Sequence, residues 1–184
     1  MVDEQNQKRW YVLRDLKRAN AKERAYEMLR HEEGDDIEVF TPLMKRAFER
    51  RGRKVIEDVP VVSDLLFVYA SRRRLDSIVA SVPTLQYRYV RGCKQNEPMT
   101  VRDEEMNRFI AVVRGIEDVK YYTPEEVSPA MYDKRIVIVG GRLDGYEGRL
   151  KTTRGSRVKR LIVELPGLLA AGVEVEAQYI RLLK

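Results

Sequence analysis

Residues 135–150 read RIVIVGGRLDGYEGRL, and this stretch decides the fold expected for the C-terminal part of the chain. It opens on a β-branched apolar run, residues 136–139, which is typical of a strand. Glycines follow closely, and glycine takes positive φ angles at no steric cost, so the chain can turn tightly and begin a second strand. Asp144-Gly145 is a favourable turn dipeptide. The stretch predicts a β-hairpin, and a phosphate-binding loop is disfavoured because no Gly-Lys-Ser/Thr or helix start follows.

The segments after this hairpin also have strand patterns. The expected strands cover residues 135–139, 146–152, 158–165, about 173–178 and 179–183. So many short strands in so short a segment predict a small SH3-like β-barrel over residues 134–184. Residues 115–133 lose the preceding periodicity and contain Pro124 and Pro129, so they are expected to form an interdomain linker.

The first 114 residues alternate between strand and helix patterns. Strand patterns fall at residues 10–13, 37–44, 65–68 and 85–90, and the third is apolar enough to be a central strand. Helix patterns fall at about 20–33, where Asn20 and Glu23 are spaced as a capping box, at 72–81, and after Thr100, a candidate N-cap. This order predicts an α/β sandwich with an antiparallel sheet, and an α+β protein as a whole.

Composition limits the classes of protein to consider. The chain has 184 residues, of which 43% are hydrophobic and 35% charged. One Cys and one His cannot supply a disulfide framework or a structural zinc site, so we expect no metal and no cofactor. No secretory signal and no apolar run of membrane-spanning length is visible, and a cytoplasmic protein that does not contact membranes is expected.

Positive charge is concentrated in the C-terminal part. Residues 134–184 contain 11 Lys+Arg and 5 Asp+Glu, which leaves 24 of each in the first 133 residues. This asymmetry indicates a module that faces nucleic acid or an acidic partner, although small barrels are also basic for solubility alone. A second basic run, KRAFERRGRK at residues 45–54, is expected as an exposed hairpin loop, either a solvated charge run or a phosphate-contacting finger.

The stretch at 135–150 resembles the KOW motif of NusG-type transcription elongation factors. The matching positions are Val139, Gly141, Tyr146, Glu147 and Gly148. Residues 10–29, 65–68, 72–82, 85–92 and 98–109 follow, in the same order, the elements of the NusG N-terminal domain. The resemblance covers roughly residues 9–184 and is strongest to specialised paralogues of the UpxY and RfaH types.

The resemblance implies a protein without catalytic activity. Its N-terminal domain would dock on the clamp helices of RNA polymerase, oppose pausing and promote antitermination, with non-template DNA or nascent RNA as further contacts. The KOW barrel would recruit a ribosomal protein or Rho.

The resemblance also assigns residues to the polymerase-binding surface. Val62 and Leu65 fall where relatives carry clamp-helix aromatics, Arg14 where a pocket aromatic can occur, and Asp76 and Ser77 near the contact to the opposite pincer. The relatives' Phe-Pro-x-Tyr segment is absent here, and Tyr87, with Tyr11 and Tyr89, is a candidate to supply apolar area instead.

Further residues are assigned to nucleic-acid and partner contacts. Lys17 and Arg18 match a region where relatives carry DNA-facing basic residues, and Arg72, Arg73 and Arg74 open the second helix as a basic cluster. Leu143 and Tyr146 match two partner-binding aromatic positions of the KOW loop, of which Leu143 is a departure.

The residues bear on two other classes of protein, an enzyme and an RNA-binding protein. Catalysis has little support, because the acidic pairs fall in turns or linkers and the lone His31 lies late in an amphipathic helix. An RNA-binding or ribosome-associated KOW protein stays open, with Lys151, Arg154, Arg157, Lys159 and Arg160 as phosphate contacts on one face of the barrel.

Overall fold

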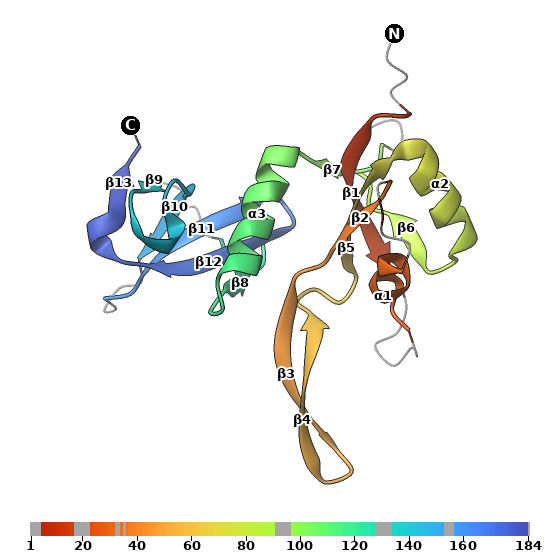
Figure 1. Cartoon of the computed structure of the whole chain (residues 1–184), viewed down its shortest axis with the longest axis horizontal. Coiled ribbons are helices and arrows are strands. Elements are labelled where there is room, and N and C mark those ends of the chain that lie inside the picture. Colours follow the sequence, from red (N-terminus) through yellow and green to blue (C-terminus); the bar gives the residue numbers. More distant parts are fainter. Residues whose placement is uncertain are drawn as a thin grey trace. The chain divides into compact units, whose positions relative to one another are not determined.

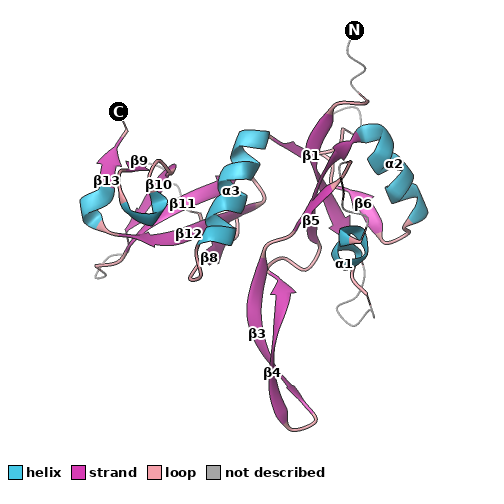
Figure 2. Ribbon diagram, in the orientation of Figure 1, coloured by secondary structure: helices cyan, strands magenta, loops and turns pink. Residues whose placement is uncertain are grey.

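A computed structural model of the chain describes residues 5–16, 23–31, 34, 36–90, 97–127, 134–152 and 157–183. By contact density the chain divides into two compact units, Met1–Asp103 and Glu104–Lys184. The expected boundary after residue 114 therefore differs from this division, which places almost all of the third helix with the C-terminal strands. Antiparallel sheets combined with helices make the protein a mixed α/β fold, as expected (Figure 2).

The N-terminal unit is built on one antiparallel sheet in the strand order β2-β5-β1-β6, with β7 also paired to β1. Its elements are β1 (Lys8–Asp15), α1 (Ala25–Arg30), β2 (Glu38–Phe40), β5 (Leu65–Ser71), α2 (Arg72–Ser81), β6 (Leu85–Tyr87) and β7 (Thr100–Val101) (Figure 1). The prediction that residues 65–68 form a central strand is confirmed, because β5 pairs with β1 on one side and β2 on the other.

One face of this sheet carries the core shared with α1 and α2. Leu13 of β1 and Val68 of β5 are fully buried there and pack with Leu29 of α1 and with Leu75 and Ile78 of α2. Leu75 and Ile78 lie three residues apart and so share one side of the helix. The periodicity that predicted a helix at 72–81 is therefore confirmed, with the same bounds.

Side-chain oxygens cap both of these helices. The backbone N–H of Ala25 donates to Oδ2 of the buried Asp15 at 2.8 Å, so the end of β1 fixes the start of α1. The Ser71 hydroxyl accepts from the Arg74 N–H at 3.3 Å at the start of α2. Such caps satisfy amides that lack a partner in the first helical turn. Helix α1 is shorter than the expected 20–33, and its expected cap Asn20 lies outside the described residues.

Residues 45–54 correct one expectation. The expected exposed hairpin is present, but residues 45–54 lie mostly in its strands, β3 (Leu43–Arg50) and β4 (Arg53–Pro60), which form their own two-stranded sheet. Oppositely charged residues face each other across it, Lys45 with Asp58, Arg46 with Glu57 and Glu49 with Lys54. Favourable cross-strand charge pairs support strands that carry little apolar pattern.

The C-terminal unit contains α3 (Asp103–Gly115) and a six-stranded antiparallel sheet in the order β13-β9-β10-β11-β12-β8. The strands are β8 (Lys120–Tyr122), β9 (Arg135–Ile138), β10 (Glu147–Thr152), β11 (Lys159–Leu165), β12 (Leu169–Val175) and β13 (Ile180–Leu182). Helix α3 begins later than expected, because Thr100 lies in β7 and is not its cap. In the described strands the pairing ends at β13 and β8, and no pair closes them into a barrel.

Strand β8 lies inside the segment expected to be linker. Its three residues pair with 170–172 of β12, and Tyr122 packs with Val127, Ile162 and Ala170. Gly172 makes this possible, since a Cβ there would lie 2.6 Å from the Tyr122 ring. Part of the expected linker is thus a structural strand of the C-terminal sheet. Among the described residues, no helix has the length and apolar character needed to cross a membrane.

Candidate functional site

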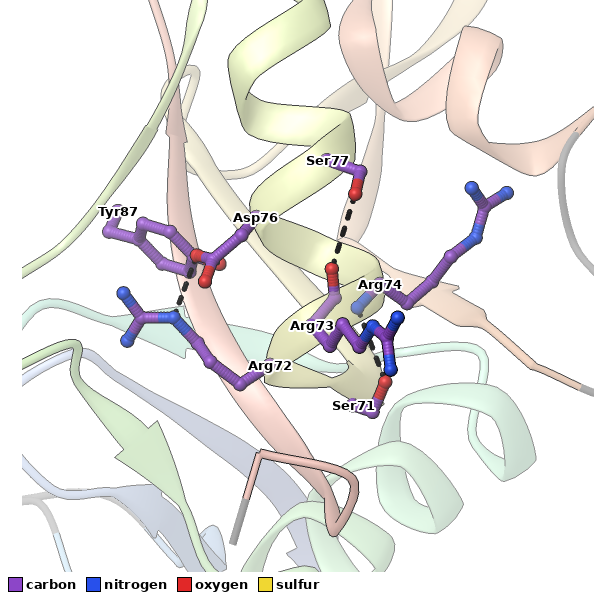
Figure 3. A network of polar contacts seen from close by, with 7 residues as sticks. All are labelled: Ser71, Arg72, Arg73, Arg74, Asp76, Ser77 and Tyr87. Atoms are coloured by element: carbon purple, nitrogen blue, oxygen red, sulfur yellow. Dashed lines mark hydrogen bonds and ion pairs between the residues drawn. The ribbon is translucent and has the colours of Figure 1, made fainter. Parts of the chain in front are cut away.

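A polar cluster joins the start of α2 to the edge strand β6. The guanidinium Nε of Arg72 donates to Oδ1 of Asp76 at 2.7 Å, and the Tyr87 hydroxyl donates to the same oxygen at 2.8 Å (Figure 3). Arg72 also lies over the Tyr87 ring, with its Cζ 4.5 Å from the ring centroid. One carboxylate and one cation therefore fix the ring of Tyr87 between two elements.

The electrostatics of this cluster favour a neutral phenol. Burial, followed by the hydrogen bond to Asp76, raises the pKa of Tyr87 far above its ordinary value of 10.0. Burial alone would lower the pKa of Arg72, but the hydrogen bond to Asp76 and the nearby Tyr87, Asp76 and Tyr11 together outweigh burial, and the pKa is raised. Tyr87 is thus a hydrogen-bond donor and Arg72 a cation throughout the physiological pH range.

The three tyrosines considered as apolar anchors separate into two groups. Tyr11 and Tyr87 are 6% and 7% exposed, their ring centroids lie 6.1 Å apart, and they belong to the core. Tyr89 is 44% exposed, and its ring centroid lies 6.3 Å from that of Tyr87. Only Tyr89 presents substantial aromatic surface to a partner.

The remaining predicted residues of α2 lie beside this cluster. Figure 3 shows Arg72 turned toward Tyr87, whereas the side chains of Arg73 and Arg74 extend to the other side of the helix. Both are exposed, as is Ser77, whose hydroxyl donates to the Arg73 carbonyl at 3.3 Å. Arg72 is committed to Asp76 and Tyr87, so Arg73 and Arg74 are the more accessible cations of the predicted triad.

A second predicted group gathers where β1 ends and the turn before β5 begins. Arg14 and Asp64 form an ion pair at 3.1 Å, and the backbone N–H of Asp15 donates to the Asp64 carbonyl at 3.2 Å. Val62 is half-buried in this turn, whereas Leu65 is only 3% exposed. Leu65 was expected to offer contact area; its burial in the central strand makes it a core residue instead.

The sequence did not single out Leu16, the residue after β1, which is 45% exposed. Its backbone N–H donates to the Thr84 carbonyl at 2.8 Å, so the residue is held in place although its side chain is open. Its position, an apolar residue directly after a buried strand, was the feature of the sequence that could have indicated an exposed contact residue. We name Arg14, Leu16, Val62 and Asp64 the β1-end surface. Lys17 and Arg18, which would extend it, lie outside the described residues.

The glycine-rich loop of the C-terminal unit is largely occupied by its own chain. The Gly140 N–H donates to Oδ1 of Asp144, and the Tyr179 ring covers Gly140 and Gly141, where added Cβ atoms would lie 3.1 and 3.2 Å from it. Leu143, predicted as a partner contact, is only 7% exposed. Its aliphatic side chain packs inward; Tyr146 is half-buried.

A cavity of about 270 Å³ lies beside this loop, lined in part by Ile116, Ile138, Leu143 and Tyr179. Arg142 reaches from the loop to the Gly115 carbonyl at 3.2 Å. The loop is therefore tied to the end of α3 within the same unit.

The basic cluster of β10 and β11 is partly neutralised. Arg160 forms an ion pair with Glu174, and the Lys151 ammonium lies 3.9 Å from the centroid of the Tyr122 ring. Burial lowers the pKa of Lys151. Arg157 is exposed and Lys159 half-buried, while Arg154 lies outside the described residues. No set of three or more His, Cys, Asp or Glu side chains among the described residues is arranged to hold a metal ion.

Comparison with known proteins gives the class to which the protein belongs. A family model described as "Transcription termination factor nusG" matches residues 8–110, more than half of the chain and nearly all of the N-terminal elements. The protein is thus a transcription factor by class. Specifically, the chain belongs to the NusG family.

The chain is also similar to a solved structure titled "Domain interaction in Thermotoga maritima NusG". The two share 15% sequence identity, with a TM-score of 0.46 over 97% of this chain and 98% of that chain. The search of curated proteins found no significant match to the chain.

Proposed function

We propose that this protein is a transcription elongation factor that docks on RNA polymerase and promotes processivity or antitermination at particular operons rather than at all genes. The family match over residues 8–110 is the observation that carries the proposal. Docking is a binding function: a factor that binds the elongating polymerase more tightly than the paused one shifts the population toward elongation. The resemblance to specialised paralogues of the UpxY and RfaH types supports operon specificity.

The β1-end surface is the proposed contact to the clamp helices. It includes the exposed aliphatic side chain of Leu16, directly after β1, and the half-buried Val62 in the turn before β5, and the Arg14–Asp64 ion pair joins that turn to β1. Protein interfaces commonly combine apolar side chains with charged residues at the rim. Leu65 supports this surface from within the core and is not itself a contact.

Helix α2 is the proposed contact to the opposite pincer of the polymerase. Asp76 holds Arg72 and Tyr87 and is half-exposed, so it fixes the shape of this end of the helix. Ser77 and Arg73 are exposed beside it and are available to a partner. The C-terminal unit is proposed to be a KOW module that closes into an SH3-like barrel and recruits a second protein, a ribosomal protein or Rho.

Transcription in vitro tests the elongation function. Single-round reactions on templates that carry candidate operon leaders should give more full-length transcript in the presence of the protein. The docking variant, Leu16→Asp with Val62→Asp, should lose the effect, because each change replaces an apolar side chain of the β1-end surface by a charge. A control variant, Val139→Asp with Leu182→Asp, makes the same substitutions at exposed positions of the C-terminal unit and should retain it. Equal activity of the two variants would contradict docking through the β1-end surface.

An RNA-binding KOW protein is the second candidate, favoured by the net charge of residues 134–184 and by the exposed Arg157. Its test is RNA affinity over a salt series. Phosphate contacts by Arg154, Arg157 and Arg160 predict a steep salt dependence that decreases when all three become Ala. A flat salt dependence of the wild type would reject this candidate.

A further inference from the structure

The β3–β4 hairpin has a feature that docking on a polymerase does not use: a basic tip on an extended ribbon. Its strands pair over all eight positions from Leu43–Pro60 to Arg50–Arg53, and each spans roughly 27 Å at about 3.4 Å per residue. Figure 1 shows the hairpin extending away from the sheet of its own unit. Exposure increases toward the tip, where every residue from 49 to 56 is exposed.

Four cations occupy five consecutive positions at this tip: Arg50, Arg51, Arg53 and Lys54, around Gly52. Arg50 forms an ion pair with Glu57 at 3.1 Å. Within the part of the chain that the structure describes, Arg51, Arg53 and Lys54 form no ion pair, although Lys54 stands opposite Glu49 in the strand pairing. Exposed cations at a turn that form no ion pair are available to contact an anion.

The turn itself indicates that charge has been favoured over conformational preference. Arg51 and Gly52 have φ angles of 51° and 72°, the arrangement of a type I′ turn. Asn, Asp or Gly is preferred at the first of these positions, and a non-glycine residue with a long side chain is uncommon there. Turn geometry explains Gly52 but does not explain an arginine at position 51.

The chemistry of the ribbon favours duplex DNA over single strands and over RNA. Proteins that bind single strands stack bases on aromatic side chains, but the one aromatic of this hairpin, Phe48, is half-buried and has Arg46 5.7 Å from its ring centroid. The deep, narrow major groove of A-form RNA excludes such an element, whereas the major groove of B-DNA admits a two-stranded ribbon. We propose that the tip of the β3–β4 hairpin binds duplex DNA, with Arg51, Arg53 and Lys54 contacting backbone phosphates.

DNA affinity measured over a salt series, with the full chain and no polymerase, tests this proposal. A tip variant, Arg51→Gln with Arg53→Gln and Lys54→Gln, removes the three cations that form no ion pair. Loss of three phosphate contacts should decrease the slope of log K against log salt by about 2.7. Between roughly 50 and 200 mM salt the wild type should therefore lose about fortyfold more affinity than the tip variant.

A control variant separates site binding from general attraction. Lys120→Gln, Lys134→Gln and Arg181→Gln remove three exposed cations from the C-terminal unit and should change the slope much less. A single variant, Arg51→Asn, suits the positive φ angle better than arginine, so it should fold at least as well while decreasing the slope by about 0.9. Any loss of affinity in Arg51→Asn cannot then be due to unfolding.

Equal slopes for the tip and control variants would overturn the proposal. Tighter binding of single-stranded DNA or of RNA than of duplex DNA, with the same dependence on the tip, would overturn the assignment to duplex DNA. Because polymerase is absent, either result leaves docking through the β1-end surface untouched, and failure of docking would leave this proposal standing.

Discussion

At the scale of single residues, Asp76 organises one end of the N-terminal unit by holding Arg72 and Tyr87 at the same carboxylate oxygen. Tyr87→Phe removes one of these hydrogen bonds and leaves the ring in place. A hydrogen bond to a charged acceptor contributes about 1.5–3 kcal/mol, so the variant should be less stable by roughly that amount at pH 8. Urea unfolding at fixed pH measures the difference.

The pH dependence of this difference follows from the raised pKa of Tyr87. The unfolded chain loses the phenol proton near pH 10, whereas the folded chain keeps it at higher pH. The unfolded state therefore gains stability above about pH 10, and the contribution of Tyr87 to folding decreases there. The difference in unfolding free energy between wild type and Tyr87→Phe should decrease from about pH 10 upward. A difference that stays constant to about pH 11 would contradict the hydrogen bond between Tyr87 and Asp76.

Gly148 is a second residue with a measurable role. A Cβ at this position in β10 would clash with the carbonyl oxygen of Ile162 and would lie 2.8 Å from Cδ1 of Leu161. Both residues belong to the neighbouring strand β11. Gly148→Ala should destabilise the C-terminal unit by about 3 kcal/mol, the upper end of the cost of overpacking. Gly115→Ala, where nothing lies within 4 Å, is the matched control and should change the unfolding free energy by less than about 1 kcal/mol. Similar effects of the two changes would show that the close approach is absent.

Which residues are accessible to a partner was harder to predict than which residues form strands and helices. The family resemblance assigned both Val62 and Leu65 to the polymerase-binding surface, yet of the two only Val62 is accessible to solvent. Burial depends on neighbouring strands that one sequence does not reveal. Leu143 is buried for a related reason, since it packs inside the loop that it was expected to present. Leu16 was missed because one exposed aliphatic side chain has no pattern of its own.

At the scale of elements, β8 gives the clearest test. Its three residues pair with β12, and Tyr122 is held between Gly172 and the Lys151 ammonium. Amides that bond in this pairing should exchange with solvent as slowly as those of β12, which hydrogen exchange with mass spectrometry or NMR measures. A flexible linker would instead exchange at the rate of an unstructured chain, and that result would contradict β8.

Gly172→Ala sharpens this measurement. The added Cβ would lie 2.6 Å from the Tyr122 ring and 2.8 Å from Ile162, so the ring must move. Protection of residues 120–122 should decrease in this variant more than protection of β9, which is separated from β12 by two strands, β10 and β11.

Most elements were predictable where apolar residues recur with one period. Helix α2 and the central strand β5 follow from such patterns. The β3–β4 hairpin was predicted, but residues 45–54 were assigned to its loop rather than to its strands, because charges occupy both faces and mask the alternation of a strand. Strand β8 was not predicted because it depends on pairing with β12 and on the space that Gly172 leaves for Tyr122, fifty positions further along the chain.

At the scale of the whole molecule, family membership rests on the N-terminal elements, whereas the excess positive charge lies in residues 134–184. The family match ends within α3, and the contact division places the boundary at the start of that helix. Sequence order was enough to predict two units, but the exact boundary depends on which contacts α3 makes. Under the proposed function, one unit binds polymerase and the other binds a second partner.

The affinity of the full chain for purified core RNA polymerase tests this account most directly. The wild type and the control variant Val139→Asp with Leu182→Asp should bind equally. The docking variant, Leu16→Asp with Val62→Asp, should bind at least about thirtyfold more weakly, which corresponds to roughly 2 kcal/mol. Circular dichroism and thermal unfolding should show that both variants fold as the wild type does. Absence of wild-type binding, or equal binding by a folded docking variant, would contradict the proposed docking.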